Sequence, residues 1–226
     1  GFELPADTAE LPVPPVDLTA NIRGDDEAIA VDAEFGFVDT DMQVRLAAQV
    51  DVDAETVSSN VEWDRAHWPV GHPEPRVISQ AGALTVSGSL DDWSVAGTID
   101  IAVPELPPGI LTIDGGGDRD GAHVQILEGN VLGGTVAGRV QYSWSTPNVY
   151  AADLTVNQVR TATAFPEWPA VLSGNVKIAG QPQPFQMTAR LSGINGEFYA
   201  QRLEADGNID IRDGSFSVGE LRIVHG

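Results

Sequence analysis

Histidine, aspartate, serine and glycine-rich loops are the parts of this chain that could supply catalytic or ligand-binding groups. The four histidines, His67, His72, His123 and His225, are scattered and lack the spacing of metal ligands. No Gly-x-Ser-x-Gly motif offers a hydrolase nucleophile, and Gly115 to Gly117 lack the Lys-Ser/Thr ending of a phosphate-binding loop. The chain has no cysteine, which excludes disulfides, thiol nucleophiles and cysteine metal sites. We therefore expect no enzyme activity and no cofactor.

Clustered aspartates raise the question of calcium. Residues 114–121 read DGGGDRDG, a composition similar to calcium-binding repeats, but a single copy supplies few of the roughly six to eight oxygen ligands that calcium needs. A glycine-rich hairpin loop explains the same letters. Pairs such as Asp25-Asp26 and Asp91-Asp92 are expected by chance in a chain with 33 acidic residues. We expect no metal site, although a calcium-stabilised extracellular adhesin or carbohydrate-binding β-domain remains the alternative interpretation.

The charge balance limits the partners. The chain has 226 residues, of which 33 are acidic and 12 basic, so its formal net charge is −21. Such a surface repels nucleic-acid backbones and anionic membrane surfaces, so contact with lipid would have to use apolar side chains. No apolar run approaches the roughly 18 residues of a membrane span. The chain starts at Gly1 without a methionine, and we expect it to be a segment of a longer protein.

Apolar and polar residues alternate from one end of the chain to the other. Met42, Val44 and Leu46, for example, are separated by polar residues. Successive side chains of a strand point to opposite faces, so this period predicts strands with one apolar and one polar face. No segment shows the 3.6-residue period of an amphipathic helix. The sequence predicts an all-β fold, an elongated antiparallel meander of ~16 strands that is about 75 Å long.

The connectors are short and carry turn residues. Asp-Gly and Asn-Gly pairs favour the positive φ angles of tight hairpins. We expect such turns at 114–115, 120–121, 195–196, 206–207 and 213–214. Proline-rich stretches predict longer bends near 68–75, 104–109, 166–169 and 182–184. Loose strand–turn–strand repeats favour one continuous segment over residues 1–226, with sub-repeats around 1–75, 80–165 and 166–226.

Four glycines lie inside predicted strands. Gly88, Gly97, Gly138 and Gly174 would weaken packing there unless the strand bends or bulges. Bends at these positions would fold the sheet lengthwise into a trough with its apolar face inside. β-Bulges in an ordinary sandwich explain the spacing equally well.

Several short motifs carry a resemblance to a known family. They are LTVSGSLDDW at 84–93, LPPGIL at 106–111, the Gly-Gly pair at 133–134 leading to VQYSW at 140–144, and WPAVLSG at 168–174. Leu11-Pro12-Val13-Pro14 and Trp63 match more loosely. With these motifs the chain resembles the AsmA-like superfamily, and within it the TamB (translocation and assembly module) family. The membrane anchor and the C-terminal end of such proteins have no counterpart in this sequence.

The resemblance implies a U-shaped β-taco with a hydrophobic groove, in a periplasmic segment whose parent protein is anchored in the inner membrane. It implies carriage of phospholipid, assistance to the assembly and translocation of outer-membrane proteins and autotransporters, or both. The implied partners are phospholipid or unfolded outer-membrane protein, and an outer-membrane protein of the TamA type.

The alternation indicates which residues would line such a groove. A register shift of one residue would move the whole set to the other face. The candidate lining residues are Val86, Leu90, Trp93, Val95, Ile99, Ile101, Val136, Val140, Tyr142, Trp144, Leu154, Val156, Leu172, Val176, Ile178, Phe185, Met187 and Leu191.

Overall fold

A computed structural model describes residues 15–38, 40–68, 70, 75, 77–102, 107–212 and 215–225. Over these ranges the chain is almost entirely β, as the alternation predicts, with one short 3₁₀ turn, η2 (Thr161–Thr163). The strands are β1 (Val16–Gly24), β2 (Ala28–Phe37), β3 (Gln43–Asp51), β4 (Thr56–Trp68), β5 (Val77–Gly88), β6 (Trp93–Ile101), β7 (Gly109–Gly117), β8 (Gly121–Val131), β9 (Gly134–Ser143), β10 (Val149–Arg160), β11 (Ala170–Gln181), β12 (Gln186–Phe198), β13 (Gln201–Arg212) and β14 (Ser215–His225).

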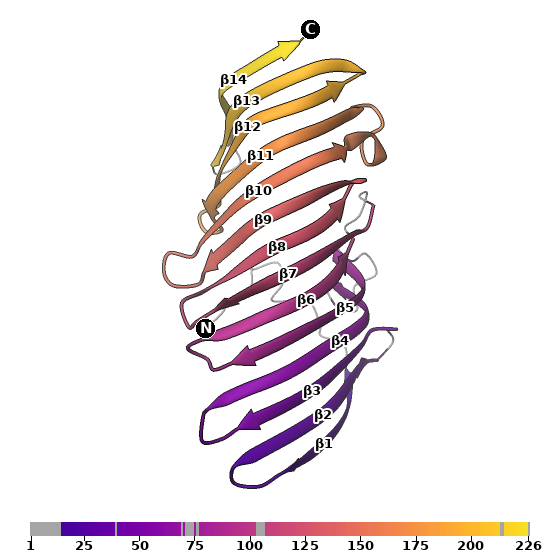
Figure 1. The fold of residues 1–226 in the computed structure, drawn as a ribbon, viewed down its shortest axis with the longest axis vertical. Helices are drawn as coiled ribbons and strands as arrows, with labels where there is room; N and C mark the ends of the chain where they lie inside the picture. The colour runs from indigo at the N-terminus through magenta and orange to yellow at the C-terminus, as the bar shows by residue number, and fades with distance from the viewer. Residues whose placement is uncertain are drawn as a thin grey trace.

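All the strands belong to one open antiparallel sheet in which spatial order follows chain order, from β1 to β14 (Figure 1). Each strand pairs with its neighbours in sequence, so the long axis of the molecule crosses the strands. At about 4.8 Å per strand the sheet is roughly 60 Å long. The described part holds 14 strands, fewer than the predicted ~16, because individual strands reach 13 residues, as β4 and β12 do.

The pairing register aligns residues of the same face from each strand to the next. A central row of apolar positions crosses the sheet from β1 to β13, each residue directly opposite the next. The row is Ala20, Ala33, Leu46, Val61, Leu84, Gly97, Ile113, Ile126, Gly138, Leu154, Val176, Leu191 and Gly207. We call the side of the sheet that carries this row the apolar face, and the opposite side the polar face.

The two faces differ in exposure. Along β3 the exposed positions, such as Arg45, alternate with half-buried ones, such as Leu46. The most enclosed apolar side chains include Ile113 and Ile126, which are 8% and 9% exposed and belong to the central row. The apolar face is therefore the inner side of the curved sheet.

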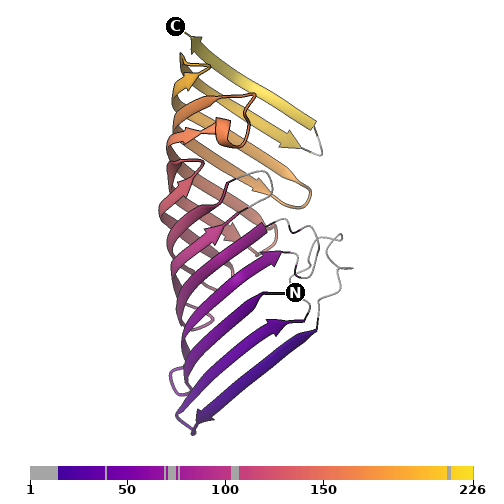
Figure 2. The same ribbon diagram turned by 90° about the vertical axis from the view of Figure 1, so that its right-hand side faces the viewer.

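Glycines permit this curvature. Gly97 and Gly138 have φ angles of +157° and +145°. Gly97 is paired without a register shift to both neighbouring strands, and Gly138 is paired in this way to β10, whereas its pairing with β8 shifts register next to it. A Cβ on Gly97 would lie 2.0 Å from the carbonyl oxygen of Ala83, and one on Gly138 would lie 2.1 Å from that of Asp153. Only glycine fits such a bend. Figure 2 shows the sheet curled along its long axis.

β-Bulges accompany the bends, but they lie in one open sheet and not in the ordinary sandwich that was the alternative interpretation of the strand glycines. The register shifts between Ser173 and Asn175, around Gly174, and elsewhere in the pairing of β7 with β8, β8 with β9, β10 with β11, β12 with β13 and β13 with β14. Bulges bend a strand and increase its twist, which adds to the curl.

Most of the tight turns predicted at Asp-Gly and Asn-Gly pairs are wrong. Only Asp120-Gly121 lies at a tight turn, where the Asp118 carboxylate accepts hydrogen bonds from the backbone N–H groups of Asp120 and Gly121 at 2.7 and 3.1 Å. The pairs at 114–115, 195–196 and 206–207 lie inside β7, β12 and β13, and the pair at 213–214 lies outside the described residues. The pair at 206–207 coincides with a register shift, because the backbone freedom that suits a hairpin also suits a bulge.

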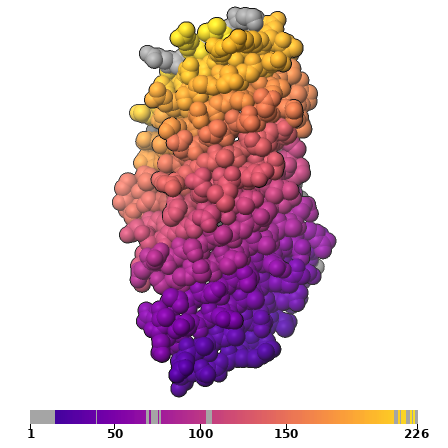
Figure 3. All heavy atoms as spheres, viewed as in Figure 1, coloured from indigo at the N-terminus to yellow at the C-terminus, as the bar shows by residue number. Residues whose placement is uncertain are grey.

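A single sheet leaves much surface open. The chain exposes 14440 Å², about 1.5 times the roughly 9,900 Å² expected for a compact protein of this size. Figure 3 shows the chain crossing the molecule in successive bands, from the indigo end to the yellow end. No side chain of the described part is buried completely, and no second layer covers the apolar face there.

Candidate functional site: an apolar face along the whole sheet

Most of the residues predicted to line a groove lie on the apolar face. Val86 lies opposite Val95, Leu154 opposite Val176, and the remaining strand members continue the same rows. The positions that the structure brings together on this face are Val86, Trp93, Val95, Ile99, Ile101, Val136, Val140, Tyr142, Leu154, Val156, Leu172, Val176, Ile178, Met187 and Leu191.

The prediction that Leu90 belongs to this set is wrong. β5 ends at Gly88, and the Ser89 hydroxyl accepts hydrogen bonds from the backbone N–H groups of Asp91 and Asp92 at 3.2 and 3.3 Å. This serine-stabilised turn places Leu90 at its tip, 75% exposed, rather than on a strand. Its period-2 spacing from Val86 continued past the end of the strand by coincidence.

Trp144 and Phe185 are two further corrections. Trp144 follows the last residue of β9 and donates its indole N–H to the carbonyl oxygen of Arg119, in the turn between β7 and β8. Phe185 lies in the turn between β11 and β12 and is 47% exposed. Both residues therefore lie at the ends of hairpins rather than within strands.

Aromatic side chains on the apolar face lie against glycines of the next strand. A Cβ added to Gly82 would lie 2.0 Å from Cζ2 of Trp63, and one on Gly180 would lie 2.7 Å from Cζ of Tyr150. The same relation joins Trp93 to Gly117, at 2.6 Å. The missing side chains leave space in which the rings lie across the sheet, as in the aromatic rescue of strand glycines. The sequence shows these aromatics in the apolar register, but their glycine partners appear only once the pairing is known.

One polar contact fixes an aromatic ring within this face. Trp63 Nε1 donates a 2.7 Å hydrogen bond to Ser79 Oγ, and that hydroxyl donates to the carbonyl oxygen of Ala81 at 3.2 Å. Ser79 is 9% exposed. The indole is thus satisfied internally and presents mainly carbon to the open side.

Comparison with protein families identifies the chain. The model of the TamB N-terminal domain matches residues 2–226. The chain belongs to the TamB family. No solved structure matches it.

Membership in the TamB family supports a TamB-type role in outer-membrane assembly or lipid transport. It favours this interpretation over the adhesin or carbohydrate-binding alternative. The single elongated sheet agrees with the taco-like fold that the resemblance implied.

Ionisable groups contribute little to this face. Where the chain is described, no three His, Asp or Glu side chains gather in a way that could hold a metal ion. Among those residues, no helix is long and apolar enough to cross a bilayer. The resolved pKa shifts belong to exposed turn residues: backbone N–H groups of Ala28 and Glu27 lower the pKa of Asp25, and a hydrogen bond from Arg119 lowers that of Asp91.

The polar face, unexpectedly, carries hollows of its own. One of about 560 Å³ is lined by residues of β1 to β4, including Asp32, Glu34, Arg45 and Glu62. Another of about 500 Å³ lies over β9 to β12 and is lined in part by Arg139 and Arg190. The sequence predicts a polar face but not these hollows, because a single strand does not reveal which of its polar residues lie level with those of the next strand.

Proposed function

We propose that the apolar face is a non-catalytic track along which acyl chains of phospholipid lie between the inner and outer membranes. The observation that supports this most is the continuity of the central row, which crosses the sheet from β1 to β13 without a charged residue. Open apolar surface well above a few hundred Å² normally marks a ligand or partner. A curled face of this kind forms the groove that the TamB resemblance implies.

Lipid chains suit such a surface physically. Each buried methylene contributes ~0.8 kcal/mol and needs no directional bond, so a chain can slide from one strand to the next without a specific site. The polar face, rich in acidic side chains, keeps the molecule in water while the apolar face is occupied. Aromatic rings that lie against glycines would not project into the space that the acyl chains occupy.

A second candidate cargo is an unfolded outer-membrane protein. β1 is exposed along its whole length and pairs only with β2 in the described part of the chain. A free edge of this kind accepts an additional strand through backbone hydrogen bonds. In this version an incoming β-strand of the client, including an autotransporter, extends the sheet while its apolar side chains contact the apolar face.

The proposed setting is the periplasm, in a parent protein anchored in the inner membrane and meeting an outer-membrane protein of the TamA type. Family membership supports this setting. The net charge of −21 fits a track that avoids adsorption to anionic headgroups along its length.

Leu154 and its neighbour Thr155 provide a matched test, because they lie next to each other on opposite faces of β10. Leu154→Asp places a carboxylate in the central row, whereas Thr155→Asp places the same charge on the polar face. Loss of contact with two methylenes costs ~1.6 kcal/mol, which is about tenfold in binding. We expect Leu154→Asp to lower co-purifying phospholipid about tenfold and Thr155→Asp to leave it unchanged.

Native mass spectrometry and organic extraction of the purified chain measure the bound lipid. A photo-crosslinking residue at position 154, compared with one at 155, reports which face meets acyl chains. Extracts of the native chain without phospholipid, or equal crosslinking from both positions, would remove the basis for the lipid track. Crosslinks at 154 to unfolded outer-membrane protein alone would favour the second cargo.

A further inference from the structure

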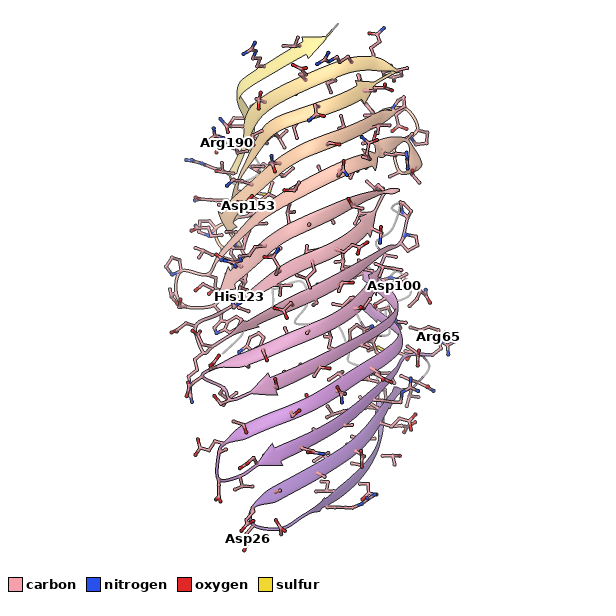
Figure 4. The ribbon with its side chains drawn as sticks, in the orientation of Figure 1. Asp26, Arg65, Asp100, His123, Asp153 and Arg190 are labelled. Carbon is pink, nitrogen blue, oxygen red and sulfur yellow. The ribbon has the colours of Figure 1, made fainter. Side chains whose placement is uncertain are left out.

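Charged side chains form a row across four strands on the polar face. Arg139 of β9 lies opposite Asp153 of β10, Asp153 opposite Lys177 of β11, and Lys177 opposite Arg190 of β12. Directly opposed residues have Cβ atoms about 5 Å apart, so the four groups fall within roughly 15 Å. Figure 4 labels two of them, Asp153 and Arg190, on neighbouring parts of the same side of the sheet.

This row carries more positive than negative charge. Lys177 Nζ lies 2.7 Å from a carboxylate oxygen of Asp153, which is the single acid of the row. Arg139 and Arg190 form no ion pair with any residue that the structure describes. Three cations therefore face one anion, in a chain whose net charge is −21. Lys177 and Arg190 are also like charges directly opposite each other, an arrangement that destabilises a sheet.

The row surrounds a hollow of about 500 Å³. Short side chains, Ala151 and Ala179, form its floor, while Arg139, Lys177 and Arg190 stand around it. Gln141 adds an amide, and Thr188 lines the rim with its hydroxyl already donated to Asp210 at 2.8 Å.

The hollow over β1 to β4 is a natural comparison. Its volume is similar, about 560 Å³, but Asp32, Glu34 and Glu62 surround its one cation. That cation, Arg45, is engaged by Glu62 at 3.7 Å and Asp64 at 2.9 Å. Free positive charge therefore distinguishes the hollow over β9 to β12 from another hollow of the same face.

We propose that the hollow over β9 to β12 binds a phosphate ester. A phosphomonoester carries about −1.5 to −2 charges at neutral pH, which matches the excess of two positive charges in the row. Arginine forks bind phosphate oxygens through paired hydrogen bonds, and lysine adds a point charge. The volume exceeds that of a phosphate group and leaves room for the organic part of the ester. The source is either a soluble phosphorylated molecule or the headgroup of a lipid, and the site is separate from the apolar face.

Calorimetric titration of the whole chain at low ionic strength tests the proposal with two probes. Glycerol 3-phosphate stands for the soluble source, and vesicles of phosphatidylcholine with phosphatidic acid, compared with phosphatidylcholine alone, stand for the lipid source. We expect the double substitution Arg139→Gln and Arg190→Gln to weaken binding about tenfold, and Asp153→Asn to strengthen it about threefold. Arg45→Gln, the control, removes a positive charge from the other hollow and should leave binding unchanged.

The outcomes separate the possibilities. Binding of glycerol 3-phosphate that the double substitution weakens supports a soluble ester, and binding confined to the vesicles with phosphatidic acid supports a headgroup. No binding of either probe, equal binding by the native chain and the double variant, or equal weakening by Arg45→Gln would overturn the proposal. Circular dichroism of each variant establishes that the sheet is intact, which we expect because the substituted side chains lie on the open polar face.

Discussion

Gly138 lies in the middle of β9, at a bend where its φ angle is +145°. Replacement by alanine would put a Cβ 2.1 Å from the carbonyl oxygen of Asp153 and 2.9 Å from Cα of Leu154, distances at which the adjoining strand must move. A residue forced into this backbone region costs ~1–3 kcal/mol, and displacement of the strand adds to that. We expect Gly138→Ala to lower the free energy of unfolding by about 2–4 kcal/mol.

Urea unfolding, followed by tryptophan fluorescence, measures this change. With a slope of ~2 kcal/mol per molar urea, the midpoint should fall by roughly 1–2 M. Gly36→Ala is the matched control, because Gly36 also lies within a strand but has no atom within 4 Å of an added Cβ. We expect its midpoint to stay at the native value or to rise by up to about 0.5 M, because alanine restricts the unfolded chain more than glycine does. Indistinguishable midpoints for the two variants would refute the link between Gly138 and the bend.

Two further changes address single contacts. Ser79→Ala leaves the indole N–H of Trp63 without its acceptor, so we expect a loss of ~1–3 kcal/mol in urea unfolding, and an unchanged midpoint would contradict this. Arg119→Gln should raise the pKa of Asp91 toward 3.8, because the guanidinium that lowers it is gone, and an NMR titration of that carboxyl measures the shift. A carboxyl group whose pKa is lowered in the folded state stabilises that state at pH values above its pKa in the unfolded chain, and this contribution is lost as the pH falls through the folded-state pKa. The stabilities of the native chain and the Arg119→Gln variant should therefore differ above about pH 4 and converge below it.

The sequence was most informative where a strand is regular. In β3 the apolar residues Val44, Leu46 and Val50 share one parity with Ala48, while Gln43, Arg45 and Gln49 have the other. This alternation predicts both the strand and its inner face, because side-chain direction in a strand is fixed by parity. The same parity correctly places most of the candidate groove residues on the apolar face. That those residues contact lipid stays a prediction.

Strand ends were harder to predict, because the alternation of apolar and polar residues can continue in the sequence beyond the point at which the strand ends. Leu90 follows a turn that Ser89 stabilises, and Phe185 lies in the turn that leads into β12. The Asp-Gly pair at 206–207 shows the converse, a turn signal used inside a strand for a bulge. Cross-strand groupings such as Arg139 with Arg190 depend on register, which bulges shift one residue at a time and which no single strand encodes.

The pairing of every strand with its sequence neighbours has a consequence for how the chain acquires its shape. All the pairings are closed by a hairpin or a short connector, so the entropy of loop closure stays small at each step. The sheet can therefore form progressively, one strand on the last, while the rest of the chain is still unpaired. Such an assembly behaves as a one-dimensional array, and insertion or removal of a hairpin lengthens or shortens it by ~10 Å without altering the strands elsewhere. Evolution can therefore adjust the length of the sheet in steps of two strands.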